Sequence, residues 1–201
     1  MTKILVLFAH PALEKSRVNQ QLIKGLDKIQ GVTFHDLYEA YPDFDVDVER
    51  EQQLLLRHDI IILHHPFYWY SAPPLTKQWI DLVLEHGWAY GRVGKALLGK
   101  KMLNVITVGG QKQAYCEQGY NMYTIRQFLF PFEQTARLCS MHYLPPIVVH
   151  GTHRMQPEDI ITARDEYHTL LRILISEQYD TNFLQSFEYL NHLLQPAYNL
   201  D

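Results

Sequence analysis

The stretch Ile4-Leu5-Val6-Leu7-Phe8-Ala9-His10-Pro11 decides the fold of this chain. Its five consecutive apolar residues are typical of a β-strand that is buried on both faces of a parallel sheet. A short loop then leads to Ser16-Arg17-Val18-Asn19, where a hydroxyl residue opens a predicted helix. A helix N-terminus favours negative charge, so this order can surround a phosphate with backbone N–H groups and the Ser16 hydroxyl. We therefore expect His10 and residues 16–19 to form an anion-binding site.

Strands and helices alternate through the rest of the chain, as they do in parallel sheets with helical crossovers. Apolar runs predict five strands, at Ile4–Phe8, Val32–Leu37, Asp59–Leu63, Met102–Val108 and Pro146–Val149. Apolar residues at helical spacing predict helices at Ser16–Ile29, Val48–Arg57, Pro73–Leu84, Tyr123–Leu138 and Pro157–Ser176. Gly31 is taken as the end of the first helix, and Pro131 as the candidate for a break in the fourth.

Right-handed crossovers turn these elements into a three-layer α/β fold with a doubly wound, five-stranded parallel sheet. The flavodoxin-like strand order 2-1-3-4-5 fits best, and such sheets bind ligands where the strand order reverses, between strands one and three. The loops at that point are His10–Ser16 and Pro66–Pro74. The loop Thr107–Tyr120, after strand four, borders the same crevice.

The chain divides into one predicted domain, residues 1–176, and a tail, residues 177–201. The tail carries apolar residues at helical spacing, namely Phe183, Leu184, Phe187, Leu190, Leu193 and Leu194. This spacing predicts an amphipathic helix whose apolar face packs on its own domain or on a second subunit.

Composition narrows the class of protein. A net charge of −4 argues against a general nucleic-acid role. No apolar run reaches 18 residues, so we expect no transmembrane span. The two cysteines, Cys116 and Cys139, form no disulfide framework and no Cys-x-x-Cys pair. A reducing cytoplasm is therefore the expected compartment.

Two loops at the expected crevice carry unusual residues. Phe67-Tyr68-Trp69-Tyr70 follows strand three, and its backbone could run along the edge of a flat ring. Thr107-Val108-Gly109-Gly110 ends strand four, and two glycines allow a close approach of the main chain to a ligand. In isolation, the glycine pair is better explained as a plain turn.

Other ligand sites are less well supported. No G-x-G-x-x-G follows the first strand, and the P-loop-like segment Gly94–Lys101 lacks the final Ser or Thr. The adjacent His64 and His65 should point to opposite faces of a strand, so they form no metal pair. We expect no metal site.

The motifs together resemble those of the flavodoxin-like NAD(P)H:quinone oxidoreductases, the DT-diaphorase group. Within it, the chain is most similar to the ancillary proteins of glutathione-regulated potassium-efflux systems of Gram-negative bacteria. The resemblance covers about residues 3 to 175. Its motifs are Ala9-His10-Pro11, Ser16 to Asn19, Leu37-Tyr38, Tyr41-Pro42-Asp43-Phe44, His65-Pro66, Trp69-Tyr70-Ser71, Pro73-Pro74-Leu75, Trp79-Ile80-Asp81, His86-Gly87-Trp88-Ala89-Tyr90-Gly91 and Leu144-Pro145-Pro146.

This resemblance implies non-covalent FMN, rather than FAD, reduced by NAD(P)H through hydride transfer to the flavin N5. A quinone-type acceptor would then use the same face, in a homodimer whose subunits both contribute to each site. His10 and residues 16–19 would hold the phosphate, while residues 67–70 and 107–110 would line the isoalloxazine. Tyr115 fits a catalytic Tyr position of the family. The catalytic His position of the family falls on Asn121 here, which puts a proton relay through that position in doubt.

Two further functions stay open. The chain could be a regulatory subunit of a potassium-efflux transporter with weak or secondary reductase activity, located at the inner membrane through that partner. It could also be a flavodoxin-like electron carrier, although the loops leave a two-sided pocket that a one-electron carrier does not need.

Overall fold

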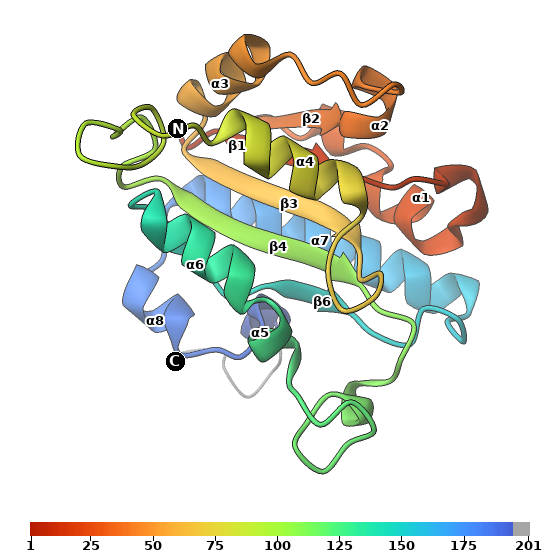
Figure 1. Cartoon of the computed structure of the whole chain (residues 1–201). Coiled ribbons are helices and arrows are strands. Elements are labelled where there is room, and N and C mark those ends of the chain that lie inside the picture. The colour runs from red at the N-terminus through yellow and green to blue at the C-terminus, as the bar shows by residue number, and fades with distance from the viewer. Residues whose placement is uncertain (195–201) are drawn as a thin grey trace.

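A computed structural model of the chain describes residues 1–194 and contains a parallel sheet between two helical layers (Figure 1). The strand order is β2-β1-β3-β4-β5, with β6 also paired to β4, and every pairing is parallel. The strands are β1 (Ile4–Phe8), β2 (Val32–Asp36), β3 (Ile60–Pro66), β4 (Lys101–Thr107), β5 (His142–Tyr143) and β6 (Ile147–Val149). The predicted doubly wound, flavodoxin-like fold is confirmed.

The strand register brings the candidate loops together at one edge of the sheet. Phe8 of β1 lies beside His64 of β3, and Thr107 of β4 lies beside both Pro66 and Val149. Since all strands are parallel, the loops after β1, β3, β4 and β6 start from this common carboxyl edge.

Helices cover both faces of the sheet, with α4 and α6 in front and α7 behind it in Figure 1. The helices are α1 (Arg17–Ile23), α2 (Leu37–Ala40), α3 (Val48–Leu56), α4 (Pro74–Val83), α5 (Ile125–Phe128), α6 (Phe130–Leu138), α7 (Pro157–Ser176) and α8 (Thr181–Gln185). Short 3-10 segments are η1 (Leu13–Lys15), η2 (Leu26–Lys28), η3 (Lys112–Ala114) and η4 (Leu190–Leu194).

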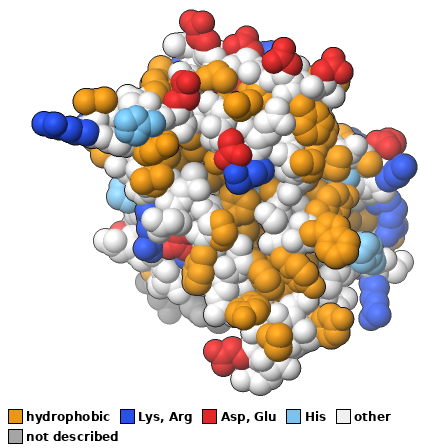
Figure 2. Space-filling model, viewed as in Figure 1, with side chains coloured by type: hydrophobic (Ala, Val, Ile, Leu, Met, Phe, Trp, Pro, Cys, Tyr) orange, Lys and Arg blue, Asp and Glu red, His pale blue; other side chains and the backbone are white. Residues whose placement is uncertain are grey.

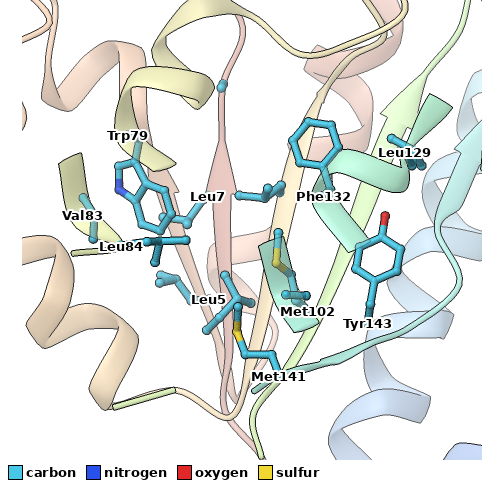
Figure 3. Packing of buried hydrophobic residues seen from close by; sticks show 14 of the residues in the cluster. Leu5, Leu7, Trp79, Val83, Leu84, Met102, Leu129, Phe132, Met141 and Tyr143 are labelled. Carbon is cyan, nitrogen blue, oxygen red and sulfur yellow. The ribbon is translucent and has the colours of Figure 1, made fainter. Parts of the chain in front are cut away.

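Alternate residues of each central strand supply two separate cores. Leu5 and Leu7 of β1 point to the layer of α2 to α6, where Trp79 and Phe132 pack against the sheet (Figure 3). Ile4 and Val6 of the same strand point to the layer of α1 and α7. These two cores hold the carboxyl edge of the sheet in place beneath the loops.

Three predicted elements differ in detail. The first helix ends at Ile23 rather than near Gly31, because Gly25 adopts a left-handed φ of +85° and a 3-10 turn follows. The last predicted strand, Pro146–Val149, is β6, and a further short strand that was not predicted, β5, precedes it; the two are separated by residues 144–146, where Pro145 and Pro146 lack the N–H of a ladder. The helix predicted over 123–138 is interrupted at Leu129, which separates α5 from α6. The interruption lies two residues before Pro131, the candidate position for a break.

The tail is not a single helix within the described residues. It forms α8 and η4, and Leu184 and Leu190 are buried in the core beside α7. The backbone N–H of Leu190 donates to the Pro146 carbonyl at 2.9 Å. The predicted tail also includes residues 195–201, which lie outside the described part. In residues 1–194, no helix combines the length and apolar character needed to cross a bilayer.

Candidate functional site

A pocket of about 460 Å³ opens at the carboxyl edge of the sheet, a volume typical of small-molecule sites. Its walls come from the loops after β1, β3, β4 and β6. The lining residues are His10, Ala12, Lys15, Ser16, Arg17, Val18, Asn19, Pro66, Phe67, Tyr68, Thr107, Gly109, Thr152 and His153. The structure therefore brings the predicted anion-site residues to the same pocket as Phe67, Tyr68, Thr107 and Gly109.

His10 presents a defined N–H to this pocket. Its side chain is buried, and its Nδ1 accepts a hydrogen bond from the Ala12 backbone N–H at 3.1 Å. Burial lowers the pKa of His10 below its usual value, so the imidazole is neutral near pH 7. A neutral ring that accepts at Nδ1 carries its proton on Nε2. His10 is thereby prepared to donate one hydrogen bond to an anion.

Asn19 organises the two hydroxyl groups of the pocket. Its Nδ2 donates to Ser16 Oγ and to Thr107 Oγ1, each at 3.0 Å, and its backbone N–H donates to Ser16 Oγ at 3.2 Å. Because both hydroxyl oxygens accept hydrogen bonds from Asn19, their own protons are free to donate elsewhere. Ser16 is also the N-cap of α1, as predicted. Asn19 is therefore a positioning residue, and its buried Oδ1 has no hydrogen-bond partner among the described residues.

The remaining predicted residues of this segment have different places. The Val18 side chain belongs to the core next to α7, although the residue also lines the pocket. The Arg17 guanidinium is exposed and donates to the Met155 carbonyl at 3.3 Å. Lys15, which the sequence analysis did not select, adds a second positive charge to the rim.

The loop after β3 makes a tight turn with unusual residues at its tip. The Ser71 backbone N–H donates to the Tyr68 carbonyl at 3.0 Å, and the two residues between them, Trp69 and Tyr70, have φ values of +49° and +63°. Bulky aromatic residues rarely adopt this left-handed conformation, and such strain is common at ligand sites. The turn holds the Trp69 side chain 92% exposed and places Tyr68 edge-on to the His10 ring.

A second pocket of about 440 Å³ adjoins the first. Phe67, Gly109 and His153 line both pockets. The second pocket adds the predicted ring-binding and catalytic residues Trp69, Tyr70, Gly110 and Tyr115. The two together form a continuous site with polar donors at one end and aromatic walls at the other.

The absence of side chains at Gly109 and Gly110 leaves room for the His153 and Tyr115 side chains. A Cβ atom built on Gly109 would lie 2.4 Å from His153 Nε2, and one built on Gly110 would lie 3.0 Å from the Tyr115 ring. The glycines thus let His153 and Tyr115 approach the backbone closely. Val108, predicted with them, has a buried side chain in the core and lines neither pocket. Its side chain, one residue beyond the end of β4, packs into the helical layer of α2 to α6, so its backbone rather than its side chain is available to a ligand.

Of the two predicted catalytic residues, Tyr115 lines the second pocket, and Asn121 lies next to it through Tyr70 and Tyr115. Asn121 Oδ1 accepts a long hydrogen bond of 3.3 Å from the Tyr70 hydroxyl. Burial, together with the neighbouring Tyr70, raises the pKa of Tyr115, and the Asn121 side chain opposes this rise. Tyr115 also contacts Phe67 edge-on, while Tyr70 stacks on Phe128 with ring centroids 5.0 Å apart. The protonated Tyr115 phenol and the Asn121 amide therefore border one aromatic cluster.

Thr152 and His153 are site residues that the sequence analysis missed. They lie in the loop after β6, whose carboxyl end joins the same edge of the sheet as β1, β3 and β4. The predicted topology could have indicated them, since a polar loop after the last strand of a doubly wound sheet also faces the crevice.

His64 and His65 are buried beneath the site and point to opposite faces, as predicted. His64 packs edge-on against Phe8 and Tyr167, and burial lowers its pKa to about 3. His65 accepts from Asn104 at Nε2, contacts the Pro66 carbonyl through Nδ1, and burial lowers its pKa to about 4. Both rings are therefore neutral supports for the floor of the site. Within residues 1–194, no cluster of three or more His, Cys, Asp or Glu side chains is arranged to hold a metal ion.

The chain matches the family described as having the flavodoxin-like fold, over residues 2–171. It is 45% identical over 170 residues to the glutathione-regulated potassium-efflux system ancillary protein KefG of Serratia proteamaculans, covering 85% of this chain and 93% of the relative. The KefG protein of Pectobacterium carotovorum is 43% identical over 176 residues, covering 88% and 96%.

Solved structures agree with these matches. General stress protein 14 from Treponema denticola, in complex with FMN, is 35% identical with a TM-score of 0.82, covering 86% of this chain and 99% of that protein. An NADPH-quinone reductase from P. pentosaceus is 34% identical with a TM-score of 0.76, covering 84% and 96%.

Proposed function

Since this chain belongs to the flavodoxin-like fold family, we propose that it is an FMN-dependent NAD(P)H:quinone oxidoreductase. One observation carries the proposal. The pocket has unopposed donors of His10, Ser16 and Thr107 at one end and the aromatic and glycine walls of Phe67, Tyr70 and residues 109–110 at the other. This division matches a ligand with a phosphate at one end and a flat ring at the other.

When bound, FMN supplies the hydride acceptor and donor at its N5 atom. The residues of the chain bind and orient this group. His10 Nε2 and the hydroxyls of Ser16 and Thr107 donate to the phosphate end, and Lys15 and Arg17 add positive charge at the rim. The loops of residues 67–70 and 107–110 line the ring. Val108 takes part through its backbone, because its side chain is buried in the core.

Tyr115 and Asn121 act on the side of the ring where substrates bind. The Tyr115 phenol remains protonated and can donate a hydrogen bond to a carbonyl oxygen of a quinone. Asn121 cannot relay a proton as an imidazole does, because its amide does not titrate. It orients the Tyr70 and Tyr115 hydroxyls instead. NAD(P)H and a quinone-type acceptor use this face in turn.

A homodimer would complete the site. Figure 2 presents hydrophobic side chains over the loop after β3 and the segment after β4. The exposed large residues of these segments are Tyr68, Trp69, Tyr70, Tyr120, Met122 and Tyr123, and Phe130 at the start of α6 is exposed as well. Exposed apolar patches of this kind mark interaction surfaces, and a second subunit seated here would cover the open side of the aromatic pocket.

The test is direct. Purified protein, saturated with FMN, should show the yellow flavin spectrum and oxidise NAD(P)H when a soluble quinone is present. Release and identification of the bound flavin distinguishes FMN from FAD. An FMN-saturated protein without quinone-dependent turnover would contradict the proposal.

A second candidate is an ancillary subunit of a potassium-efflux transporter, favoured by the KefG relatives at 43–45% identity. The chain would then work in the cytoplasm, at the inner membrane through its partner. Co-expression with such a transporter should allow co-purification and raise potassium efflux. A variant that binds FMN but lacks turnover separates the two functions, since an ancillary role predicts that it still raises efflux.

A further inference from the structure

The groove between α1 and α7 is rich in positive charge. It lies on the face of the sheet opposite to α3 and α4, and it has two depressions of about 460 Å³ and 650 Å³. Its cations come from α1, η2, the turn between them and α7, and they are Arg17, Lys24, Lys28, Arg164 and Arg172. A concentration of cations is unexpected in a chain whose net charge is −4.

The two depressions are connected with each other and with the candidate flavin pocket. Lys24 and Arg164 line both depressions, and Arg17 lines the smaller depression as well as the flavin pocket. Along α7, Arg164 and Arg172 are eight residues apart, a distance of about 12 Å at the helical rise. The positive charge therefore follows a line rather than converging on one point.

Most of these cations have no internal counter-charge. Arg164 pairs with Asp165 at 2.8 Å, but Lys24, Lys28 and Arg172 form no ion pair within residues 1–194. His168 lies between Arg164 and Arg172 on α7, is buried, and contacts the Leu22 carbonyl. The unpaired side chains are exposed and can reach an incoming anion.

Apolar side chains form part of the lining of the groove. Ile160 and Ile161 line the smaller depression, and Ile29 and Ile175 line the larger one. Ile161 is 44% exposed. Cations beside these isoleucines match a ligand that alternates carboxylates with apolar side chains.

We propose that this groove binds an extended acidic segment of a protein partner. Separated cations on both walls of a groove fit a chain of carboxylates better than a single phosphate, which needs converging donors. A recessed site between two helices also accommodates a peptide better than it accommodates a flat lipid surface. The proposal goes beyond the reductase function and is independent of it, because the groove lies outside the flavin pocket except for Arg17.

The test uses FMN-saturated protein, so that the flavin site cannot compete for the probe. The probe is a fluorescent peptide of about seven residues in which Glu alternates with Leu, about 23 Å long when extended. Fluorescence anisotropy should show saturable binding that weakens as salt rises. The Lys28→Glu/Arg172→Glu variant should bind roughly tenfold more weakly, since reversing charges converts attraction into repulsion.

The matched control is Arg57→Glu/Lys95→Glu, which makes the same charge change at exposed positions on the opposite layer. It should bind the probe like the unmodified protein. Three results would each overturn the proposal: equal binding of a Lys–Leu peptide, equal weakening by the control variant, or binding only to phosphatidylglycerol vesicles. The test measures binding alone, so its failure leaves the reductase proposal intact.

Discussion

Asn19 of α1 donates from Nδ2 to Thr107 Oγ1 of β4 at 3.0 Å, across 88 positions of sequence. The same nitrogen donates to Ser16 Oγ. One buried amide thus ties the first helix to the central sheet and orients two hydroxyl protons toward the pocket. The polar end of the site depends on this bridge.

Replacement of Asn19 by Asp should weaken FMN binding by roughly ten- to a hundredfold. The substitution keeps the shape but removes the Nδ2 donor and adds a charge, so the two hydroxyls turn back toward the carboxylate; a lost buried hydrogen bond of this kind costs about 1–3 kcal/mol. Quenching of flavin fluorescence on titration measures the Kd. Asn182→Asp, in α8, is the control and should bind FMN normally. An unchanged Kd for Asn19→Asp would show that the bridge does not prepare the donors.

Asn121→His should raise the turnover with quinone, because an imidazole can deliver the proton that the amide cannot. The added activity should depend on pH near the His pKa, whereas the unmodified enzyme should lack this dependence. Steady-state kcat measured from pH 5 to 9 checks this expectation. Tyr115→Phe, which removes the phenol, should lower kcat in both backgrounds. Equal pH profiles for Asn121 and its His variant would rule out a proton role at this position.

Gly109→Ala should fold normally but weaken FMN binding. The new methyl group would meet His153 Nε2 at 2.4 Å, and the exposed imidazole would swing away into the flavin site. Adding His153→Ala to this variant should restore much of the affinity, because it removes the displaced ring. The double-mutant cycle in FMN Kd measures this coupling. Additive effects of the two substitutions would show that His153 does not mediate the loss.

The stability of the fold should fall as the solution is acidified below pH 6.5. Burial lowers the pKa of His64 to about 3 and that of His65 to about 4, so both are neutral in the folded chain. The unfolded chain takes up these protons at about pH 6.5. The contribution of each group to the free energy of unfolding is therefore fully present above about pH 6.5. It decreases as the pH falls from about 6.5 to the pKa of the group in the folded chain, by up to about 1.4 kcal/mol per pH unit.

His64→Phe isolates one of these groups. Its two ring nitrogens have no hydrogen-bond partner within the described residues, and its neighbours Phe8 and Tyr167 are aromatic, so a phenyl ring can replace it. Urea unfolding at pH 7 and pH 5 should show a smaller loss of stability in the variant. His142→Phe, at an exposed position, should keep the original pH dependence. Identical slopes in the two variants would contradict burial as the cause.

Much of the site follows from local pattern. Apolar runs such as Ile4–Phe8 predict buried parallel strands, and their order predicts where the crevice lies. Residues 67–70 could be assigned to this crevice because they directly follow a strand. Residues 16–19 could be assigned to it because they follow the loop after the first strand. The predicted end of the first helix was wrong, since Gly25 and Gly31 both permit a positive φ and pattern alone does not choose between them.

The sequence by itself determined the sheet order, the edge that carries the site and the separation of polar from aromatic loops. Only the tertiary structure decided that Asn19 braces Thr107, that His153 lies over Gly109 and that Val108 turns into the core. The physical reason is that strand and helix patterns are set by neighbouring residues, whereas these contacts join distant ones. They depend on the lateral register of β1, β3, β4 and β6, which forms only when both cores pack.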